Sequence, residues 1–208
     1  MSLASAERAA ISDAFDAVGP DRPTLCEGWT TADLLAHLLV RERRPWMSAG
    51  IAIPALASLT DKAMAAWGST PWADRVALLR GGPPPWSPWF VPALDRMVNG
   101  AELYVHHEDV RRGEPGWEPR PADAARDAEL WAIVGRMAKL TYRKSPVGVV
   151  LRRPDGESIV AKSADHGVTV TGEPGELVLH AFGRSAVRVE TDGEAADVAA
   201  LAAASRGI

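Results

Sequence analysis

Residues 90–113 read FVPALDRMVNGAELYVHHEDVRRG, and they carry the pattern on which the expected fold depends. Glu102 and His106 stand four residues apart in this stretch. Four residues turn an α-helix by about 400°, so both side chains would lie on one face, one turn apart. A carboxylate and an imidazole in this arrangement can bind one metal ion. The same spacing is common in surface ion pairs, so the pair alone leaves both interpretations open.

A third candidate ligand lies in residues 30–42, TTADLLAHLLVRE, where His37 interrupts an apolar helical run. Such a histidine is often a core residue with one hydrogen bond. Together with Glu102 and His106, however, it would complete a donor set that suits Zn²⁺, with nickel, iron and manganese as alternatives. Three protein ligands leave a coordination position open, as in catalytic sites. We call His37, Glu102 and His106 the triad and predict that they form one metal site.

Three polar residues follow His106 directly in the sequence HHED. By helix geometry His107 and Glu108 point away from the face of Glu102 and His106, so we interpret them as supporting or surface residues. Asp109 lies on that face and could orient His106 or reach the mouth of the site. The alternative is that HHED is a solvated, charged face of the helix.

Two arginines and one cysteine each allow more than one interpretation. Arg111 and Arg112 could attract an anionic substrate or simply favour the end of the helix. Cys26, the single cysteine, excludes an intrachain disulfide, which fits a reducing compartment. We interpret it as a buried, inert thiol, with a fourth metal ligand or a redox site as alternatives.

Composition sets broad limits on the class of protein. The chain has 208 residues with 47% hydrophobic content, enough for a substantial core, and a formal net charge of −4. Basic residues do not gather into a long face, so we expect no nucleic-acid partner. Neither a signal peptide nor an apolar run of about 18 residues is evident, so we expect no membrane association and a cytoplasmic protein.

The periodicity of apolar residues predicts two kinds of structure in succession. Up to Tyr142 it is helical, with Gly-Pro and Gly-Gly pairs as helix ends. The expected helices cover about 5–17, 31–44, 71–80, 88–112 and 122–142, with short pieces between 45 and 67. RERR at 41–44 closes the second helix with mostly positive charge. We therefore predict a helical bundle over residues 1–142.

After Ser145 the period becomes that of strands. VGVVLRR, ESIVAKS, GVTVTG and AVRVETDG read as four strands, EPGELVLHAFG as a short helix and EAADVAALAAAS as a closing helix. We predict that residues 146–208 form a small α+β domain, distinct from the helical part.

Three segments of the chain resemble a known family. TLCEGWTTADLLAHLLVRE and NGAELYVHHEDVRR resemble the two halves of the metal-binding signature of mycothiol-dependent maleylpyruvate isomerases and related DinB-like proteins. VTVTGEPGELVLHAFGR resembles the sterol-carrier-like domain that follows the metal domain in those isomerases. The resemblance implies an antiparallel four-helix bundle, the triad as ligands of a divalent ion (zinc in the isomerase), and chemistry with mycothiol. It is greatest to actinobacterial proteins described only as metal-binding.

From these observations we expect a metal-dependent enzyme that uses a low-molecular-weight thiol as a transferase or isomerase on a small electrophile. Arg184 is a candidate anion contact for the thiol or substrate, or else a solvated loop arginine. The sequence between His37 and Glu102 is rich in proline and tryptophan, unlike the family, so substrate identity does not carry over. The alternative is a non-catalytic protein that binds metal or a small ligand, and a homodimer is compatible with either.

Overall fold

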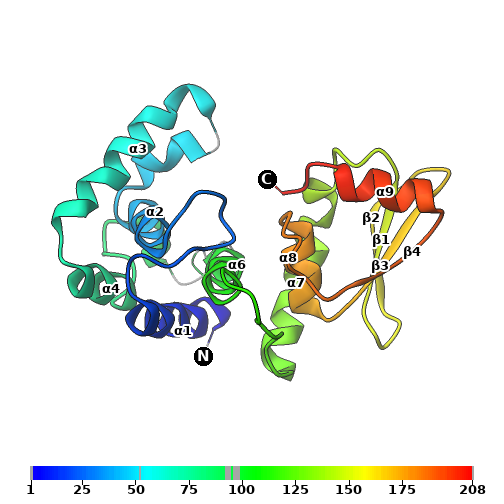
Figure 1. Ribbon diagram of the computed structural model, residues 1–208, viewed down its shortest axis with the longest axis horizontal. Helices are drawn as coiled ribbons and strands as arrows, with labels where there is room; N and C mark the ends of the chain where they lie inside the picture. Colours follow the sequence, from blue (N-terminus) through cyan, green and yellow to red (C-terminus); the bar gives the residue numbers. More distant parts are fainter. Residues whose placement is uncertain (1, 52, 92–94, 96–98, 208) are drawn as a thin grey trace. The chain divides into compact units, whose positions relative to one another are not determined.

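The computed structural model describes residues 2–51, 53–91, 95 and 99–207. The chain divides into two compact units, Met1–Trp117 and Glu118–Ile208. Helices make up the regular structure of the first unit, and the second combines helices with a sheet (Figure 1). This agrees with the predicted change from helical to strand periodicity along the chain.

The described residues of the first unit form five α-helices and several short 3₁₀ segments. The α-helices are α1 (Leu3–Val18), α2 (Thr31–Arg43), α3 (Ala57–Ala65), α4 (Trp72–Arg80) and α6 (Gly100–Arg111). The 3₁₀ segments are η1 (Pro45–Ile51), η2 (Pro54–Leu56), η3 (Ala66–Ser69) and η4 (Pro88–Phe90). The broken pattern predicted for residues 45–67 corresponds to η1, η2, α3 and part of η3.

A capping box fixes the start of α2. The Thr30 side chain accepts a hydrogen bond from the Asp33 backbone N–H, and the Asp33 carboxylate accepts one from the Thr30 N–H. Two backbone donors that helix geometry leaves without partners are thereby satisfied. The predicted box is present although it has Asp where Glu or Gln is usual. This capping box starts α2, and His37 lies in the second turn of that helix.

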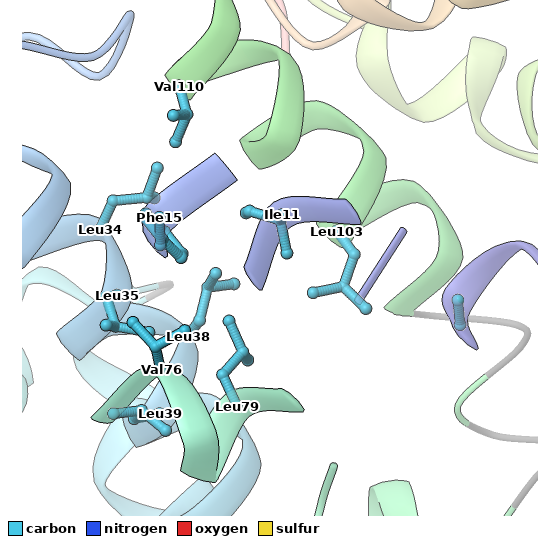
Figure 2. Close-up of a cluster of buried hydrophobic side chains, with 11 residues drawn as sticks. Ile11, Phe15, Leu34, Leu35, Leu38, Leu39, Val76, Leu79, Leu103 and Val110 are labelled. Carbon is cyan, nitrogen blue, oxygen red and sulfur yellow. The ribbon is translucent and has the colours of Figure 1, made fainter. Parts of the chain in front are cut away.

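A single apolar cluster joins four helices of the first unit, as Figure 2 shows. Helix α1 packs against α6 and α4, while α2 packs against α4 and α3. Leu38 and Leu103, each next in sequence to a member of the triad, are almost fully buried in the cluster. The cluster therefore sets the rotation of α2 and α6, and with it the positions of His37 and Glu102. Its larger members are Ile11, Phe15, Leu34, Leu35, Leu38, Leu39, Val76, Leu79, Leu103 and Val110.

The start of the predicted helix over 88–112 is wrong. Residues Pro88–Phe90 form the separate 3₁₀ segment η4, and Val91 has extended backbone angles. The Ser87 hydroxyl accepts a hydrogen bond from the Trp89 N–H, which favours this short turn. Helix α6 begins at Gly100, and residues 92–94 and 96–98 of the predicted helix lie outside the described part of the chain.

The second unit is a four-stranded sheet with three helices. The strands are β1 (Gly148–Arg152), β2 (Ser158–Lys162), β3 (Gly167–Thr171) and β4 (Glu190–Asp192), and the helices are α7 (Ala124–Thr141), α8 (Pro174–Ala181) and α9 (Ala195–Ala203). The strand order is β2-β1-β3-β4, with β1 and β3 parallel and both other pairs antiparallel. Strand β4 is shorter than the AVRVETDG segment suggested.

The buried face of this sheet comes from alternate residues of its central strands. Val149 pairs with Val168 and Leu151 with Val170 in the parallel register, and all four side chains are buried. Helices α7 and α8 lie side by side (Figure 1), and α7 also packs against β2. The boundary in the structure therefore precedes α7, whereas we predicted it between residues 142 and 146. The finer assignments, a four-helix bundle and a sterol-carrier-like domain, stay predictions.

Within the described residues, none of the helices has the length and apolar character that crossing a membrane requires.

Candidate metal centre

Three side chains from α2 and α6 meet at one carboxylate oxygen. Oε1 of Glu102 lies 3.2 Å from Nε2 of His37 and 3.1 Å from Nε2 of His106. The two imidazole rings are 5.1 Å apart at their centroids and nearly perpendicular. Both histidines are buried, and 21% of the Glu102 side chain is exposed. The structure thus brings together the three residues of the triad, although 65 residues separate His37 from Glu102.

The hydrogen bond on the far side of His106 determines which of its nitrogens is basic. Nδ1 lies 2.8 Å from Oδ2 of Asp109, a carboxylate oxygen that accepts, so Nδ1 carries a proton. In the neutral ring Nε2 then presents a lone pair to Glu102, which also accepts. Either a second proton or a metal cation at Nε2 resolves this conflict. A carboxylate–histidine pair of this kind is the usual support behind a metal ligand.

The charge states of the triad follow from burial and neighbouring groups. Burial opposes ionisation of Glu102, but Arg41 and the two histidines outweigh it, so its pKa lies well below the usual value. Burial chiefly lowers the pKa of His37. Burial also opposes protonation of His106, but bonds with Asp109, Cys26 and Glu102 raise its pKa well above the usual value. Glu102 and His37 are therefore ready to bind a cation, while His106 must release a proton.

The donor set fits a divalent metal ion. One ligand atom from each member of the triad can be chosen so that the three lie within 4.8 Å of one another. Two imidazoles and one carboxylate are a known catalytic zinc set, and other first-row metals accept the same donors. Nδ1 of His37 is buried without a hydrogen-bond partner in the described part of the protein. The Trp29 ring, 5.2 Å away, packs against this imidazole.

Cys26 lies nearer the site than its interpretation as an inert thiol suggested. Its Sγ is 3.2 Å from Oδ2 of Asp109 and 3.9 Å from Nδ1 of His106, and the residue is half-buried. Cys26, His106 and Asp109 form a second group of convergent ligand atoms. This group uses the opposite nitrogen of His106, so Cys26 does not face the donors of the triad. The position of Cys26 in the first family-like motif, TLCEGWTTADLLAHLLVRE, was the sequence signal that could have placed it near the site.

The interpretation of HHED as a solvated face is wrong, since His106, His107, Glu108 and Asp109 are all buried. Nδ1 of His107 is 2.9 Å from Oε2 of Glu7 in α1, on a different side of α6 from the triad. Glu108 is fully buried and accepts hydrogen bonds from the two arginines that follow it, Arg111 and Arg112. Because α6 packs on α1 and carries its own ion pairs, its polar residues do not require contact with water.

Sequence reasoning missed Arg41. Its Nε is 3.3 Å from Oε1 of Glu102, the oxygen that both histidines contact. Arg41 follows His37 by four residues in α2, the same spacing that identified Glu102 and His106. We assigned it only to the positive end of the helix, although the spacing placed it on the face of His37.

Two other features of the chain are Arg184 and a cavity of the first unit. Arg184 belongs to the second unit, where it donates to the Phe182 carbonyl, and its role as an anion contact stays a prediction. A cavity of about 480 Å³ is lined by residues that include Trp29, Asp33, Asp61 and Arg75. Its lining includes Trp29, which packs against His37, but no member of the triad, so we do not assign it to the candidate centre.

Comparison with known proteins finds matches among solved structures. No family model and no curated protein matches the chain. A crystal structure of the mycothiol-dependent maleylpyruvate isomerase matches with a TM-score of 0.59 over 94% of this chain and 92% of that chain, at 20% identity. The chain has the fold of this maleylpyruvate isomerase. A variant of the isomerase with one histidine replaced by alanine matches equally well, at 19% identity.

The likeness to the maleylpyruvate isomerase confirms, at the level of the fold, the resemblance that the sequence motifs indicated. Because it extends over most of both chains, it includes the helical unit and the unit with the sheet.

Proposed function

We propose that this protein is a metal-dependent enzyme that uses a low-molecular-weight thiol, of the mycothiol class, to isomerise a small electrophile or transfer the thiol to it. The observation that carries the proposal is the convergence of two imidazole nitrogens on one oxygen of Glu102. The fold of a mycothiol-dependent maleylpyruvate isomerase supports it. We propose the triad as the ligands and zinc as the ion.

Each residue of the proposed centre has a defined task. A divalent ion held there would supply the Lewis acidity that keeps a thiol in its nucleophilic thiolate form. Glu102 provides the anionic ligand, and His37 and His106 provide neutral donors. Asp109 holds the Nδ1 proton of His106, which would leave Nε2 as the nitrogen that binds an ion. Burial of the two imidazoles keeps water from competing for their nitrogens.

Thiol binding to cobalt-substituted protein tests the proposal. Co²⁺ occupies zinc sites and reports its ligands through its visible spectrum, and a thiolate ligand adds a charge-transfer band. We expect the wild-type protein to develop this band when titrated with mycothiol or 2-mercaptoethanol. The methyl thioether of 2-mercaptoethanol, which cannot form a thiolate, is the matched control and should not produce it.

The same titration separates the two candidate roles. If cobalt binds but no thiol alters its spectrum, the thiol-dependent proposal fails and the alternative, a non-catalytic metal-binding protein, is favoured. If a thiol binds, assays of cis–trans isomerisation and of thiol addition with conjugated electrophiles distinguish isomerase from transferase.

A further inference from the structure

Arg41 places a positive charge at the centre of the proposed metal site. Its Nε and the Nε2 atoms of both histidines all lie between 3.1 and 3.3 Å from the same Glu102 oxygen. A cation bound by the triad would therefore sit close to a guanidinium group.

Three contacts hold Arg41 in this position. Its Nη2 donates to Oδ1 of Asn99 at 3.2 Å, and its guanidinium carbon lies 5.9 Å from the centroid of the Trp89 ring. The indole of Trp89 also donates to the Arg41 carbonyl. Asn99 is itself fixed by donating to Asp95. With 16% of its side chain exposed, Arg41 is a pre-positioned group rather than a solvated one.

The two expected effects of this charge have opposite signs. Arg41 competes with a metal ion for Glu102 and repels it, so it should weaken metal binding. The same charge attracts an anion that approaches the ion, so it should strengthen binding at the open coordination position. A divalent ion together with Glu102, Asp109 and Arg41 leaves one positive charge in excess, which one anionic ligand would neutralise. A residue that only stabilised the fold would not weaken metal binding while strengthening anion binding.

We propose that Arg41 makes the open position of the metal centre selective for an anionic ligand, either a thiolate or the carboxylate of an electrophilic substrate. This inference rests on the proposed function, because it requires the triad to bind a metal ion. In this inference Arg41 selects an anionic ligand over a neutral one, and it takes no part in the reaction of the bound ligand.

The test compares three variants of α2 with the wild-type protein. Arg41→Gln removes the charge, Arg41→Lys keeps it without the guanidinium fork, and Arg43→Gln removes a neighbouring arginine that bonds the Leu78 and Gly82 carbonyls instead. Competition with a chelator gives the affinity for Co²⁺. Titration of the cobalt protein with 2-mercaptoethanol and with acetate gives the affinities for a thiolate and a carboxylate. Circular dichroism checks that each variant is folded.

For Arg41→Gln we expect anion affinity to fall by about tenfold or more and Co²⁺ affinity to stay equal or rise. Arg41→Lys should keep anion affinity within about threefold, and Arg43→Gln should leave both affinities within about twofold. The anion that loses most affinity identifies whether Arg41 serves the thiolate or the carboxylate.

Two results overturn the inference. Loss of metal and anion affinity together in Arg41→Gln would mean that Arg41 only supports the structure. Unchanged anion affinity in that variant would mean that the charge does not act on the open position. Both differ from failure of the proposed function, in which wild-type protein itself binds no cobalt.

Discussion

Oε1 of Glu102 is the atom around which the candidate centre is arranged, because two imidazoles and one guanidinium all contact it. A carboxylate oxygen with three cationic or potentially cationic neighbours holds its negative charge firmly, which agrees with the lowered pKa of Glu102. The position of Glu102 depends in turn on Leu103, which the core of the first unit buries.

Asp109 should determine how strongly His106 binds a metal ion. Asp109→Asn keeps the size of the side chain but removes the charge that holds the Nδ1 proton of His106. We expect metal affinity to fall by about 10- to 100-fold, as measured by competition with a chelator. Cys26→Ala is the control, since it removes a different contact of Oδ2 but no group on the Nε2 side of His106. Equal losses in the two variants would contradict this role for Asp109.

Helical spacing and the two family-like motifs were sufficient to predict that the triad would meet. Arg41 and Cys26 were misjudged for a physical reason. A helix pattern shows which residues share a face, but it does not show which other helix that face meets. Arg41 was therefore assigned to the end of its own helix, although in three dimensions it reaches Glu102. Cys26 reaches Asp109, 83 residues away in the chain, through a loop that no periodicity describes.

At the scale of the element, the capping box of Thr30 should stabilise α2. Thr30→Ala removes the hydroxyl that accepts from the Asp33 N–H, and we expect it to lower the free energy of unfolding of the first unit by about 1 kcal/mol. Thr30→Ser retains a hydroxyl and should lose less than half as much. Urea denaturation followed by far-ultraviolet circular dichroism measures both. A Ser variant as unstable as the Ala variant would show that the hydroxyl bond is not the cause.

Local signals predicted the ends of elements well. Thr30 caps α2, the Gly81-Gly82 pair follows α4, and the turn between β1 and β2 includes Gly156, whose φ of 96° suits glycine. Prediction failed at residues 88–91, where the period of apolar residues continued although the Ser87 and Pro88 turn interrupts the helix. The prediction also placed α7 in the first unit. The apolar stripe of a helix shows which face is buried, but it does not show which other element covers that face.

At the scale of the whole molecule, the stability of the second unit should depend on pH because of one buried pair of side chains. The Tyr142 hydroxyl and Nδ1 of His180 form a hydrogen bond of 2.6 Å, and both residues are buried. Burial lowers the pKa of His180 from 6.5 to about 4 and raises that of Tyr142. Because the unfolded chain binds the proton more tightly, stability from neutral His180 is complete above about pH 6.5 and is lost as pH falls toward 4. The loss is about 2 kcal/mol by pH 5 and about 3 kcal/mol by pH 4.

The His180→Asn variant isolates this contribution. Asparagine can still form a hydrogen bond with Tyr142 but does not titrate, so the stability of the variant should change less than that of the wild type between pH 7 and 4. Hydrogen exchange of α8 amides, compared between the two proteins at each pH, measures the difference for the second unit within the full chain. Parallel pH curves for the two proteins would contradict the assignment to His180.

The two units differ in how much their residues indicate about function. The likeness to the maleylpyruvate isomerase at 20% identity extends over both, and it shows the fold alone. In the first unit the donor atoms of the triad support a specific chemistry. In the second, Arg184 has a local contact with the Phe182 carbonyl, and only an activity assay of its variants can give it a role.

The central claim is that the triad binds one divalent metal ion, and two neighbouring histidines provide its most direct test. His106→Asn keeps a group that can bond Asp109 but removes Nε2, whereas His107→Asn keeps a group that can bond Glu7 and leaves the triad intact. Metal content is measured by mass spectrometry on wild-type protein and both variants after saturation with Zn²⁺ and removal of excess. We predict about one equivalent in the wild type and in His107→Asn, and little or none in His106→Asn. Equal metal content in the two variants, or a wild type that retains none, would contradict the account.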